Sequence, residues 1–493
     1  MKKVLLTIID GFGISYESDG NAIKYSRMDN YNKLVDKYPN VRLEASGRKV
    51  GLQKGIAGNS EIGHMSIGAG RIIKQNMMQM EDLFDYENLS NNKTYNKMID
   101  YINTNEKALH IVALLSDSGI HSHIKFILKM LDILHESNIV KVYFHAILDG
   151  KDTNTKAIDF LTQVNDKLRF HKMGTIATIC GRMYAMDKNK DYDKTKVYYD
   201  LIAKGEGNYT NNLSNTINEL YNEGNTDYDM PPIILDRKGI IKDNDVIVSL
   251  NYRKDSIIQI LEMLSNSNNN LEKSIFNDLK IYTIYNIKEI KNNNYFLDNT
   301  RIDSPIGVYL ASLGLSQARI ADVSKYVYVN YYFDGCHDLK LENCDRFLIQ
   351  KKDEKDPVKA MDMTSIDLTK QTIKCMDNDY DFIVVNYSTP DLLANKNDFE
   401  GTKRALEVVD YCLGKLYEYA QDNFYTMFIL SDHGNCEDFL KLGNTLNPVP
   451  LIVTDDKVNL TNGCLTNVAP TILKYMDISL PKEMQETEDL FVK

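Results

Sequence analysis

The segment Thr426-Met427-Phe428-Ile429-Leu430-Ser431-Asp432-His433 decides the fold, because an apolar, β-prone run ends there in a carboxylate and an imidazole. The start of the chain has the same pattern, since Val4-Leu5-Leu6-Thr7-Ile8-Ile9 leads into Asp10-Gly11. Runs as apolar as these predict strands of a buried parallel sheet. In open α/β sheets, ligands bind beyond the carboxyl ends of the strands. We therefore expect the chain to fold back on itself and to place Asp10, Asp432 and His433 at such an edge.

A serine flanked by glycines lies between these two strands, in Gly58-Asn59-Ser60-Glu61-Ile62-Gly63-His64. Glycine lets the backbone turn sharply and approach a ligand closely. By itself, Gly-Asn-Ser is typical of a turn, and an aspartate at the end of a strand can simply cap the following helix. Together, a hydroxyl nucleophile, carboxylates and an imidazole favour metal-assisted phosphoryl chemistry.

The composition narrows the class of protein. The chain has 493 residues, 43% of them hydrophobic and 26% charged, which is ordinary for a globular protein of two or more domains. A net charge of −11 without a basic block argues against a nucleic-acid partner. No apolar run approaches the roughly 18 residues of a spanning helix, so we expect no membrane partner. The 7 cysteines, without CxxC spacing, predict reduced thiols in a cytoplasmic protein.

The middle of the chain has its own alternation of strands and helices. The predicted elements are a helix at 124–134 and strands at 108–115, 142–148 and 176–180. This order predicts parallel strands joined by right-handed crossovers. Two polar stretches, 205–229 and the Asn-rich 265–294, are interpreted as peripheral loops and short helices. Alternation returns in the final third, with a strand at 382–386 and a helix at 402–419, so the economical layout is one α/β domain inserted into another, discontinuous one.

Together with further motifs along the chain, these residues match a family: the chain resembles cofactor-independent phosphoglycerate mutase of the alkaline-phosphatase-like superfamily. The resemblance spans nearly the whole length, and its motifs stand in order as Asp10-Gly11, the segment 58–64, His121-Ser122-His123, Leu148-Asp149-Gly150, Gly181-Arg182, Asn251-Tyr252-Arg253, Pro390-Asp391, Asp432-His433-Gly434-Asn435 and Asn447-Pro448-Val449-Pro450. It implies two α/β domains: a discontinuous metal-binding domain at 1–74 and 300–493 and an inserted substrate-binding domain at 75–299. It also implies a monomer.

The implied activity is the interconversion of 3-phosphoglycerate and 2-phosphoglycerate, in glycolysis and gluconeogenesis, without bisphosphoglycerate. The reaction would pass through a phosphoserine at Ser60 and use two divalent metals, usually manganese and possibly magnesium. The family's second metal site is complete here, as Asp10, Ser60, Asp432 and His433.

The first metal site departs from the family pattern. Asp391 is present, but Asn395 and Asn444 stand where the family has histidines. Asparagine offers a hard oxygen in place of a borderline nitrogen, which favours magnesium or calcium over manganese or zinc. Either this site is retuned for a hard cation or it is empty, and the sequence leaves both open.

The substrate pocket is also altered. The resemblance assigns substrate binding to His121, Lys151, Asp152, Arg182, Lys188, Arg253 and Lys325, and assigns general acid–base catalysis to Asp152. The family has arginines at Lys151, Arg182, Lys188, Arg253 and Ser256; two remain, two are lysine, and one is lost. Lysine keeps the charge but loses the planar fork that binds phosphate through two hydrogen bonds.

Two alternatives remain beside an active mutase. One is a degenerate homologue, either a non-catalytic binding protein or a slow single-metal phosphatase, because of Asn395 and Asn444. The other is a different phosphoryl enzyme of the same superfamily, such as a phosphopentose mutase. That enzyme would share the metal motifs but would not explain the matches at His121, Asp152 and Arg182.

Overall fold

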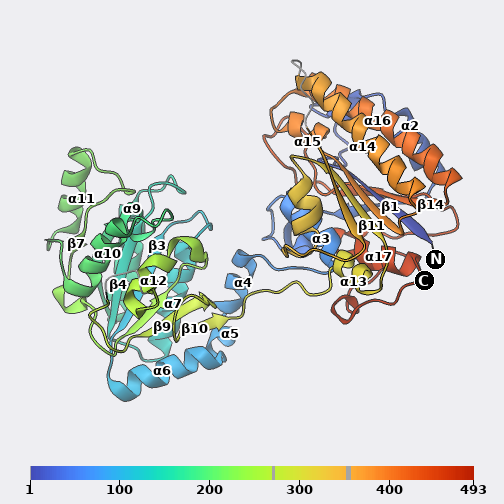
Figure 1. Ribbon diagram of the computed structural model, residues 1–493. Coiled ribbons are helices and arrows are strands. Elements are labelled where there is room, and N and C mark those ends of the chain that lie inside the picture. Colours follow the sequence, from blue (N-terminus) through green and yellow to red (C-terminus); the bar gives the residue numbers. More distant parts are fainter. Residues whose placement is uncertain (1, 269–272, 351–356, 493) are drawn as a thin grey trace. The chain divides into compact units, whose positions relative to one another are not determined.

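The chain forms two compact α/β units, each built on its own sheet. The computed structural model describes residues 2–268, 273–350 and 357–492. One unit comprises Met1–Met78 with Arg301–Lys493, and the other comprises Gln79–Thr300. Each contains an 8-stranded sheet, so the predicted α/β class, with one unit inserted into a discontinuous one, is confirmed (Figure 1). The assignment of metal binding to one unit and substrate binding to the other is part of the proposal below.

The sheet of the discontinuous unit places the two ends of the chain side by side. Its strands, in spatial order, are β12 (Cys344–Ile349), β11 (Gln317–Asp322), β13 (Phe382–Tyr387), β1 (Lys3–Ile9), β14 (Tyr425–Leu430), β15 (Val449–Val453), β2 (Asn40–Glu44) and β16 (Gly463–Cys464). β1 pairs in parallel with β13 and with β14, and β15 is antiparallel to both of its neighbours. The carboxyl ends of β13, β1 and β14 therefore meet at one edge.

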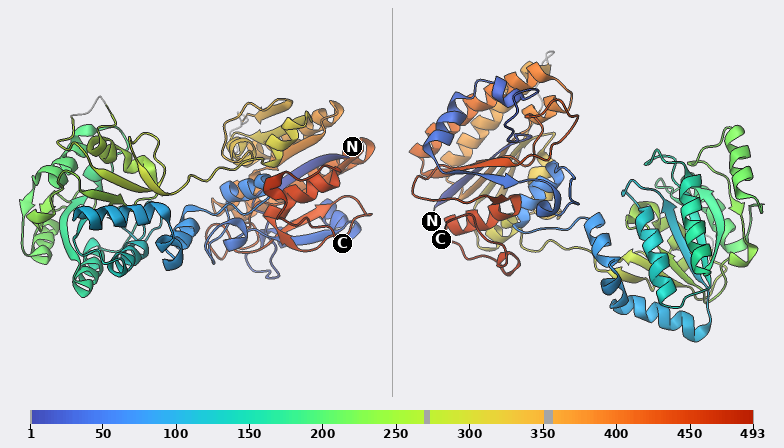
Figure 2. Two further views of the ribbon diagram at one scale, coloured as in Figure 1. Left: turned by 90° about the horizontal axis from the view of Figure 1, so that it is seen from below. Right: turned by 180° about the vertical axis from the view of Figure 1, so that it is seen from behind.

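Helices cover both faces of this sheet (Figures 1 and 2). They are α1 (Ala22–Tyr25), α2 (Asp29–Lys37), α3 (Ser60–Ala69), α13 (Ile306–Ser312), α14 (Pro357–Asp377), α15 (Thr389–Ala394), α16 (Phe399–Asp422) and α17 (Val468–Tyr475), while α4 (Asn76–Leu83) spans the boundary between the units. Leu5 and Ile9 of β1 pack with α2, α14 and α16, whereas Val4, Leu6 and Ile8 pack with α3, α13 and α17. Successive side chains point to opposite faces, which is why the β1 run is apolar throughout.

The inserted unit has the same architecture. Its strands, in spatial order, are β10 (Asn294–Leu297), β9 (Lys280–Tyr285), β8 (Val246–Ser249), β3 (Leu109–Leu115), β4 (Val142–Leu148), β5 (Gly174–Gly181), β7 (Ile233–Ile234) and β6 (Asn208–Tyr209). Its helices are α5 (Tyr86–Ser90), α6 (Lys93–Asn105), α7 (Ile124–Glu136), α8 (Ala157–His171), α9 (Arg182–Ala185), α10 (Tyr192–Lys204), α11 (Leu213–Asn222) and α12 (Ile258–Ser265). The strands from β10 to β5 are parallel.

The structure confirms the elements predicted at 108–115, 124–134, 142–148 and 176–180, which are β3, α7, β4 and β5. It corrects the interpretation of 265–294 as loops and short helices. β9 lies in that stretch and pairs with β8 and β10, so it belongs to the sheet. Residues 269–272 of the same stretch lie outside the described part of the chain.

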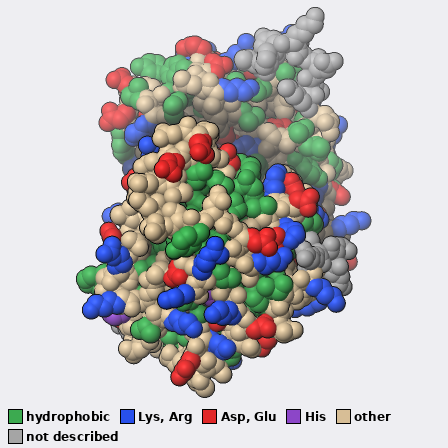
Figure 3. Space-filling view, turned by 90° about the vertical axis from the view of Figure 1, so that its left-hand side faces the viewer, with side chains coloured by type: hydrophobic (Ala, Val, Ile, Leu, Met, Phe, Trp, Pro, Cys, Tyr) green, Lys and Arg blue, Asp and Glu red, His purple; other side chains and the backbone are tan. Residues whose placement is uncertain are grey.

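Charged side chains of both signs lie on the face drawn in Figure 3. In the described residues, no helix combines the length and the apolar character that crossing a bilayer requires.

Candidate active site

Ser60 begins helix α3 and is 8% exposed. Asn59 caps this helix, because its side-chain oxygen accepts a hydrogen bond from the backbone N–H of Ile62 at 2.9 Å. A Cβ atom at Gly58 would lie 2.1 Å from the carbonyl oxygen of Ala45, so only glycine allows this approach to Ser60. Since the N-terminus of a helix attracts anions, the position suits a group that accepts a phosphoryl unit.

Three buried aspartates converge beside Ser60. Asp10 follows β1, Asp432 follows β14, and Asp391 lies in α15, which follows β13. Because these strands are parallel neighbours, the carboxylates meet at the carboxyl edge of the sheet. The groups predicted from the two ends of the chain are therefore brought together.

The hydroxyl of Ser60 is surrounded by charged groups. Its Oγ lies 3.1 Å from Nε2 of His433 and 3.4 Å from Oδ1 of Asp10. Lys325, which follows β11, donates a hydrogen bond from Nζ to this Oγ at 2.5 Å. The same ammonium donates to Oδ1 of Asp10 at 2.9 Å and to Oδ2 of Asp391 at 3.0 Å.

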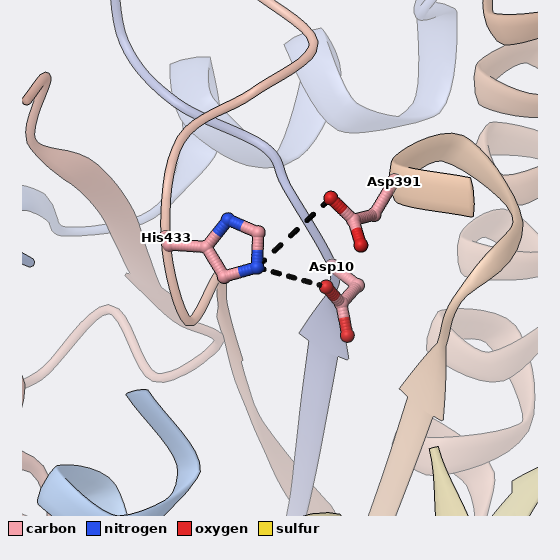
Figure 4. Close-up of side chains that lie close together, drawn as sticks. All are labelled: Asp10, Asp391 and His433. Carbon is pink, nitrogen blue, oxygen red and sulfur yellow. Dashed lines mark ion pairs between the residues drawn. The ribbon is translucent and has the colours of Figure 1, made fainter. Parts of the chain in front are cut away.

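His433 lies between carboxylates (Figure 4). Its Nε2 is 3.3 Å from Oδ1 of Asp10, 3.7 Å from Oδ2 of Asp432 and 3.9 Å from Oδ1 of Asp391. Burial lowers the pKa of His433, but the surrounding carboxylates outweigh it and raise the pKa to about 10. The surroundings therefore favour a cation at this nitrogen.

Asp432 provides a direct test of whether a metal fits. Both of its oxygens are buried, and neither accepts a well-formed hydrogen bond from any described residue, the closest contact being Nδ1 of His64 at 3.2 Å from Oδ2. Burial would raise the pKa of Asp432, yet His433 and His64 outweigh it and hold the pKa well below its usual range, so the group is a carboxylate. A buried carboxylate without donors is costly unless a cation satisfies it. The residues present thus fit a divalent ion.

Two groups of side chains could hold such an ion in the described part of the chain. One is Asp10, Asp391 and His433, and the other is Asp10, His64 and Asp432; within each, the ligand atoms lie within 4.8 Å of one another. The sequence prediction assigned Ser60 and His433, and not His64, to the ion beside Asp432.

His64 and Asn386 were missed by the sequence analysis. Nδ1 of His64 lies 2.8 Å from the backbone oxygen of Ser60 and 3.2 Å from Oδ2 of Asp432. Asn386, on β13, lies with its Nδ2 3.1 Å from Nε2 of His64 and donates from it to Oδ2 of Asp10 at 2.9 Å. These two residues orient the carboxylates. The available signal was spacing, because His64 follows Ser60 by one helical turn.

The residues of the altered first metal site lie close to this cluster but face different partners. Asn395 donates from Nδ2 to Oδ2 of Asp391 at 3.0 Å. Asn444 donates from Nδ2 to the backbone oxygen of Gly58 at 2.8 Å. The oxygen of Asn395 accepts a hydrogen bond from Nδ2 of Asn435 at 3.1 Å.

The inserted unit carries a separate polar cluster, built on the residues that follow β3, β4 and β5. Nη1 of Arg182 donates to Oδ2 of Asp152 at 2.6 Å and to Oδ1 of Asp149 at 2.5 Å. Nε2 of His121 lies 3.7 Å from Oδ2 of Asp152. Burial and the nearby positive charge of Arg182 lower the pKa of His121 to about 4, so His121 is neutral near pH 7. Its Nδ1 lies 2.9 Å from Oγ of Ser256.

The remaining predicted substrate residues lie at the rim of this cluster. Asp255 contacts Nζ of Lys188 at 3.4 Å and Nε of Arg253 at 3.2 Å. The side chains of Lys188 and Arg253 are 43% and 51% exposed, and Lys151 is exposed as well. Lys325, also predicted to bind substrate, belongs to the discontinuous unit with Ser60.

Comparisons with known proteins agree with this arrangement. A family model described as the BPG-independent PGAM N-terminus matches residues 80–289. The 2,3-bisphosphoglycerate-independent phosphoglycerate mutases of Clostridium acetobutylicum and Gracilaria tenuistipitata var. liui are 32% and 34% identical to the chain. Each alignment covers 98% of this chain, and 98% and 97% of the respective relative. Phosphoglycerate mutase of Leishmania mexicana, solved at low cobalt concentration, shares the fold with a TM-score of 0.62 and 22% identity, over 100% of this chain and 98% of that one.

Fold and site together define a two-unit α/β protein in which a serine, three carboxylates and a histidine meet at the edge of one sheet. Within that class, the chain belongs to the 2,3-bisphosphoglycerate-independent phosphoglycerate mutases.

Proposed function

We propose that the chain is a metal-dependent phosphoglycerate mutase that interconverts 3-phosphoglycerate and 2-phosphoglycerate, as in glycolysis and gluconeogenesis, without bisphosphoglycerate. The phosphoryl group would be carried on Ser60. The observation that supports this most directly is the buried hydroxyl at the start of α3, which Lys325 and His433 contact beside three carboxylates.

Ser60 would accept the phosphoryl group through its own surroundings. A divalent ion held by Asp10, Asp432 and His433 would supply positive charge that favours the deprotonated hydroxyl. Burial lowers the pKa of Lys325, but Asp10 and Asp391 outweigh it and raise the pKa well above its usual range, so Lys325 stays charged. Its ammonium can therefore offset the charge of a phosphoryl group on Ser60, and the N-terminal N–H groups of α3 add to this effect.

The inserted unit would hold the glycerate. Arg182, Lys188, Arg253 and Lys151 supply positive charge for the carboxylate and phosphate, and neutral His121 supplies a hydrogen bond. Burial raises the pKa of Asp152, but the hydrogen bond from Arg182 outweighs it and lowers the pKa, so Asp152 is ionised. An ionised carboxylate can accept the proton of a glycerate hydroxyl and return it to the other oxygen after transfer.

For the ion at Asp10, Asp432 and His433 we propose manganese, with magnesium as the alternative, because two carboxylates and an imidazole suit manganese. We propose a location in the cytoplasm, since all 7 cysteines are free thiols, as expected in a reducing compartment. We also propose a monomer, as the resemblance implies. A degenerate homologue is not proposed, because phosphoglycerate mutases match nearly the whole chain, and the expected nucleophile, acid–base residue, neighbouring lysine and ligands of one metal are present: Ser60, Asp152, Lys325, Asp10, Asp432 and His433.

The test is conversion of 3-phosphoglycerate to 2-phosphoglycerate by metal-stripped protein, without bisphosphoglycerate, during titration with manganese or magnesium. Metal-dependent conversion is expected, together with a phosphorylated peptide that contains Ser60 after acid quenching. Ser60→Ala should abolish both, and Ser66→Ala in the same helix should retain both. Folded protein that converts nothing with either metal would refute the proposal.

A further inference from the structure

We propose that the chain holds one divalent ion, at Asp10, Asp432, His433 and Ser60, where the resemblance implies two. The part of the site at Asp391 is closed instead by hydrogen bonds from Asn395, Asn435 and Lys325. The inference rests on the proposed function, because it concerns the metal content of the same active site.

The two carboxylates at the edges of the cluster differ in how they are satisfied. Asp391 accepts from Asn435 at Oδ1, at 2.8 Å, and from Asn395 and Lys325 at Oδ2, both at 3.0 Å. Asp432, equally buried, accepts no well-formed hydrogen bond from the described residues at either oxygen, and its closest contact is Nδ1 of His64, 3.2 Å from Oδ2. A buried carboxylate that lacks donors is suited to an ion, whereas one that already has three donors is not.

The amide of Asn395 is fixed in an orientation that keeps its oxygen away from an ion at Asp391. Its nitrogen faces the Asp391 carboxylate, and its oxygen accepts from Asn435. Turning the amide by half a rotation would set oxygen against carboxylate and nitrogen against the nitrogen of Asn435, which loses both hydrogen bonds. The side-chain oxygen of asparagine is also one bond closer to Cβ than Nε2 of a histidine would be.

Asn444 has a different partner altogether. Its nitrogen donates to the backbone oxygen of Gly58, two residues before Ser60. The side chain that stands in place of a histidine ligand thus ties down the loop that carries the nucleophile. Asn395 presents its nitrogen, and not its oxygen, to Asp391.

The ammonium of Lys325 takes the central position in this part of the site. It is 4% exposed and lies within 3.0 Å of Asp10, Asp391 and Ser60 at once. With one divalent ion, the formal charge of the three carboxylates and Lys325 is balanced. A second divalent ion at Asp391 would have to lie beside this buried ammonium and displace its hydrogen bonds.

The experiment counts the ions in the full chain. Metal-stripped protein is saturated with manganese, freed of excess ion, and assayed for manganese per chain by elemental mass spectrometry and by calorimetric titration with manganese alone. We expect one ion per chain. Two ions, or none in folded protein, would overturn the inference.

A matched pair of variants locates the ion. Asp432→Asn should lose it, and Asp391→Asn should retain it, with circular dichroism to show that both are folded. Equal losses in the two variants would overturn the inference. Conversion of 3-phosphoglycerate is measured on the same samples: two ions with conversion would refute the ion count alone, and one ion without conversion would refute the proposed function alone.

Discussion

Two buried polar clusters, one beside the sheet of the discontinuous unit and one within the sheet of the inserted unit, are satisfied in opposite ways. At the edge of the first sheet, Asp432 accepts no well-formed hydrogen bond from the described residues. Within the second, His110 and His145 lie on neighbouring strands and every ring nitrogen has a partner. Buried groups that lack partners indicate a ligand, whereas groups with complete partners indicate structure.

The complete chain of hydrogen bonds begins at Asp245, just before β8, and crosses β3, β4 and β5 of the inserted unit. Asp245 accepts from Nε2–H of His110 at 3.1 Å, so Nδ1 of His110 accepts from Nε2–H of His145 at 2.9 Å. Nδ1 of His145 in turn accepts from the hydroxyl of Thr178 at 2.8 Å. The network is satisfied with both histidines neutral, in agreement with the lowered pKa of each.

The largest effect should come from Asp432→Asn. Removing the open carboxylate takes away the ion that stabilises charge on Ser60, so kcat should fall by about 10³-fold or more. Steady-state assays measure kcat, and circular dichroism shows whether the variant is folded; a folded variant with unchanged kcat would break the contrast between the two clusters.

His110→Phe should lower stability and leave activity unchanged. It leaves Nε2–H of buried His145 without an acceptor, so the free energy of unfolding should fall by about 2 kcal/mol, while kcat per folded molecule stays unchanged. The control is His135→Phe, an exposed position on α7 where the change should stay within about 0.5 kcal/mol. Loss of activity without loss of stability would mean that the network serves the chemistry.

The pH dependence of stability sharpens the same contrast. Burial lowers the pKa of His110 and of His145, so each binds its proton less readily in the folded than in the unfolded chain. Their contribution is complete above the usual histidine pKa and is lost as the pH falls below it. Between pH 6.5 and 5.5 the loss should be at most about 1 kcal/mol per histidine, the value for a histidine that stays neutral in the folded chain. Denaturation at the two pH values should show a smaller difference in His145→Phe than in the unchanged chain.

The smallest effect is expected for Ser256→Ala. It removes the hydrogen bond that orients His121, so KM for 3-phosphoglycerate should rise about threefold to tenfold with little change in kcat. Ser256→Thr keeps the hydroxyl and should keep the KM. An unchanged KM in Ser256→Ala would mean that His121 is oriented by other contacts.

Sequence patterns were sufficient to predict those elements whose structure depends on the local order of apolar and polar residues. The apolar runs that became β1 and β14 predicted the convergence of Asp10, Asp432 and His433, because a run that is apolar on both faces has to be a buried strand. β9 was missed because Ile281 and Ile284 form a short apolar run among asparagines, and its place depends on pairing with β8 and β10.

The partners of individual amides could not be predicted from sequence. The sequence shows asparagine at 395 where the family has histidine, and this leaves two alternatives for the first metal site: a site retuned for a hard cation, or an empty one. Which way its amide turns depends on Asn435 and Asp391, which come from other parts of the chain. His64 and Asn386 were missed for the same reason, since their role exists only once β1 and β13 are paired.

The position of β1 has a consequence for how the protein is made. Its two neighbours are β13 and β14, so this apolar strand leaves the ribosome long before either partner exists. At roughly 5–20 residues per second, synthesis has to run on the order of 20 to 70 seconds before Phe382 of β13 follows Ile9. The inserted unit can fold during that interval, because all of its strands have been translated by then. In the nascent chain, β1 therefore stays unpaired while the inserted unit can already be folded. We expect molecular chaperones to act on this segment.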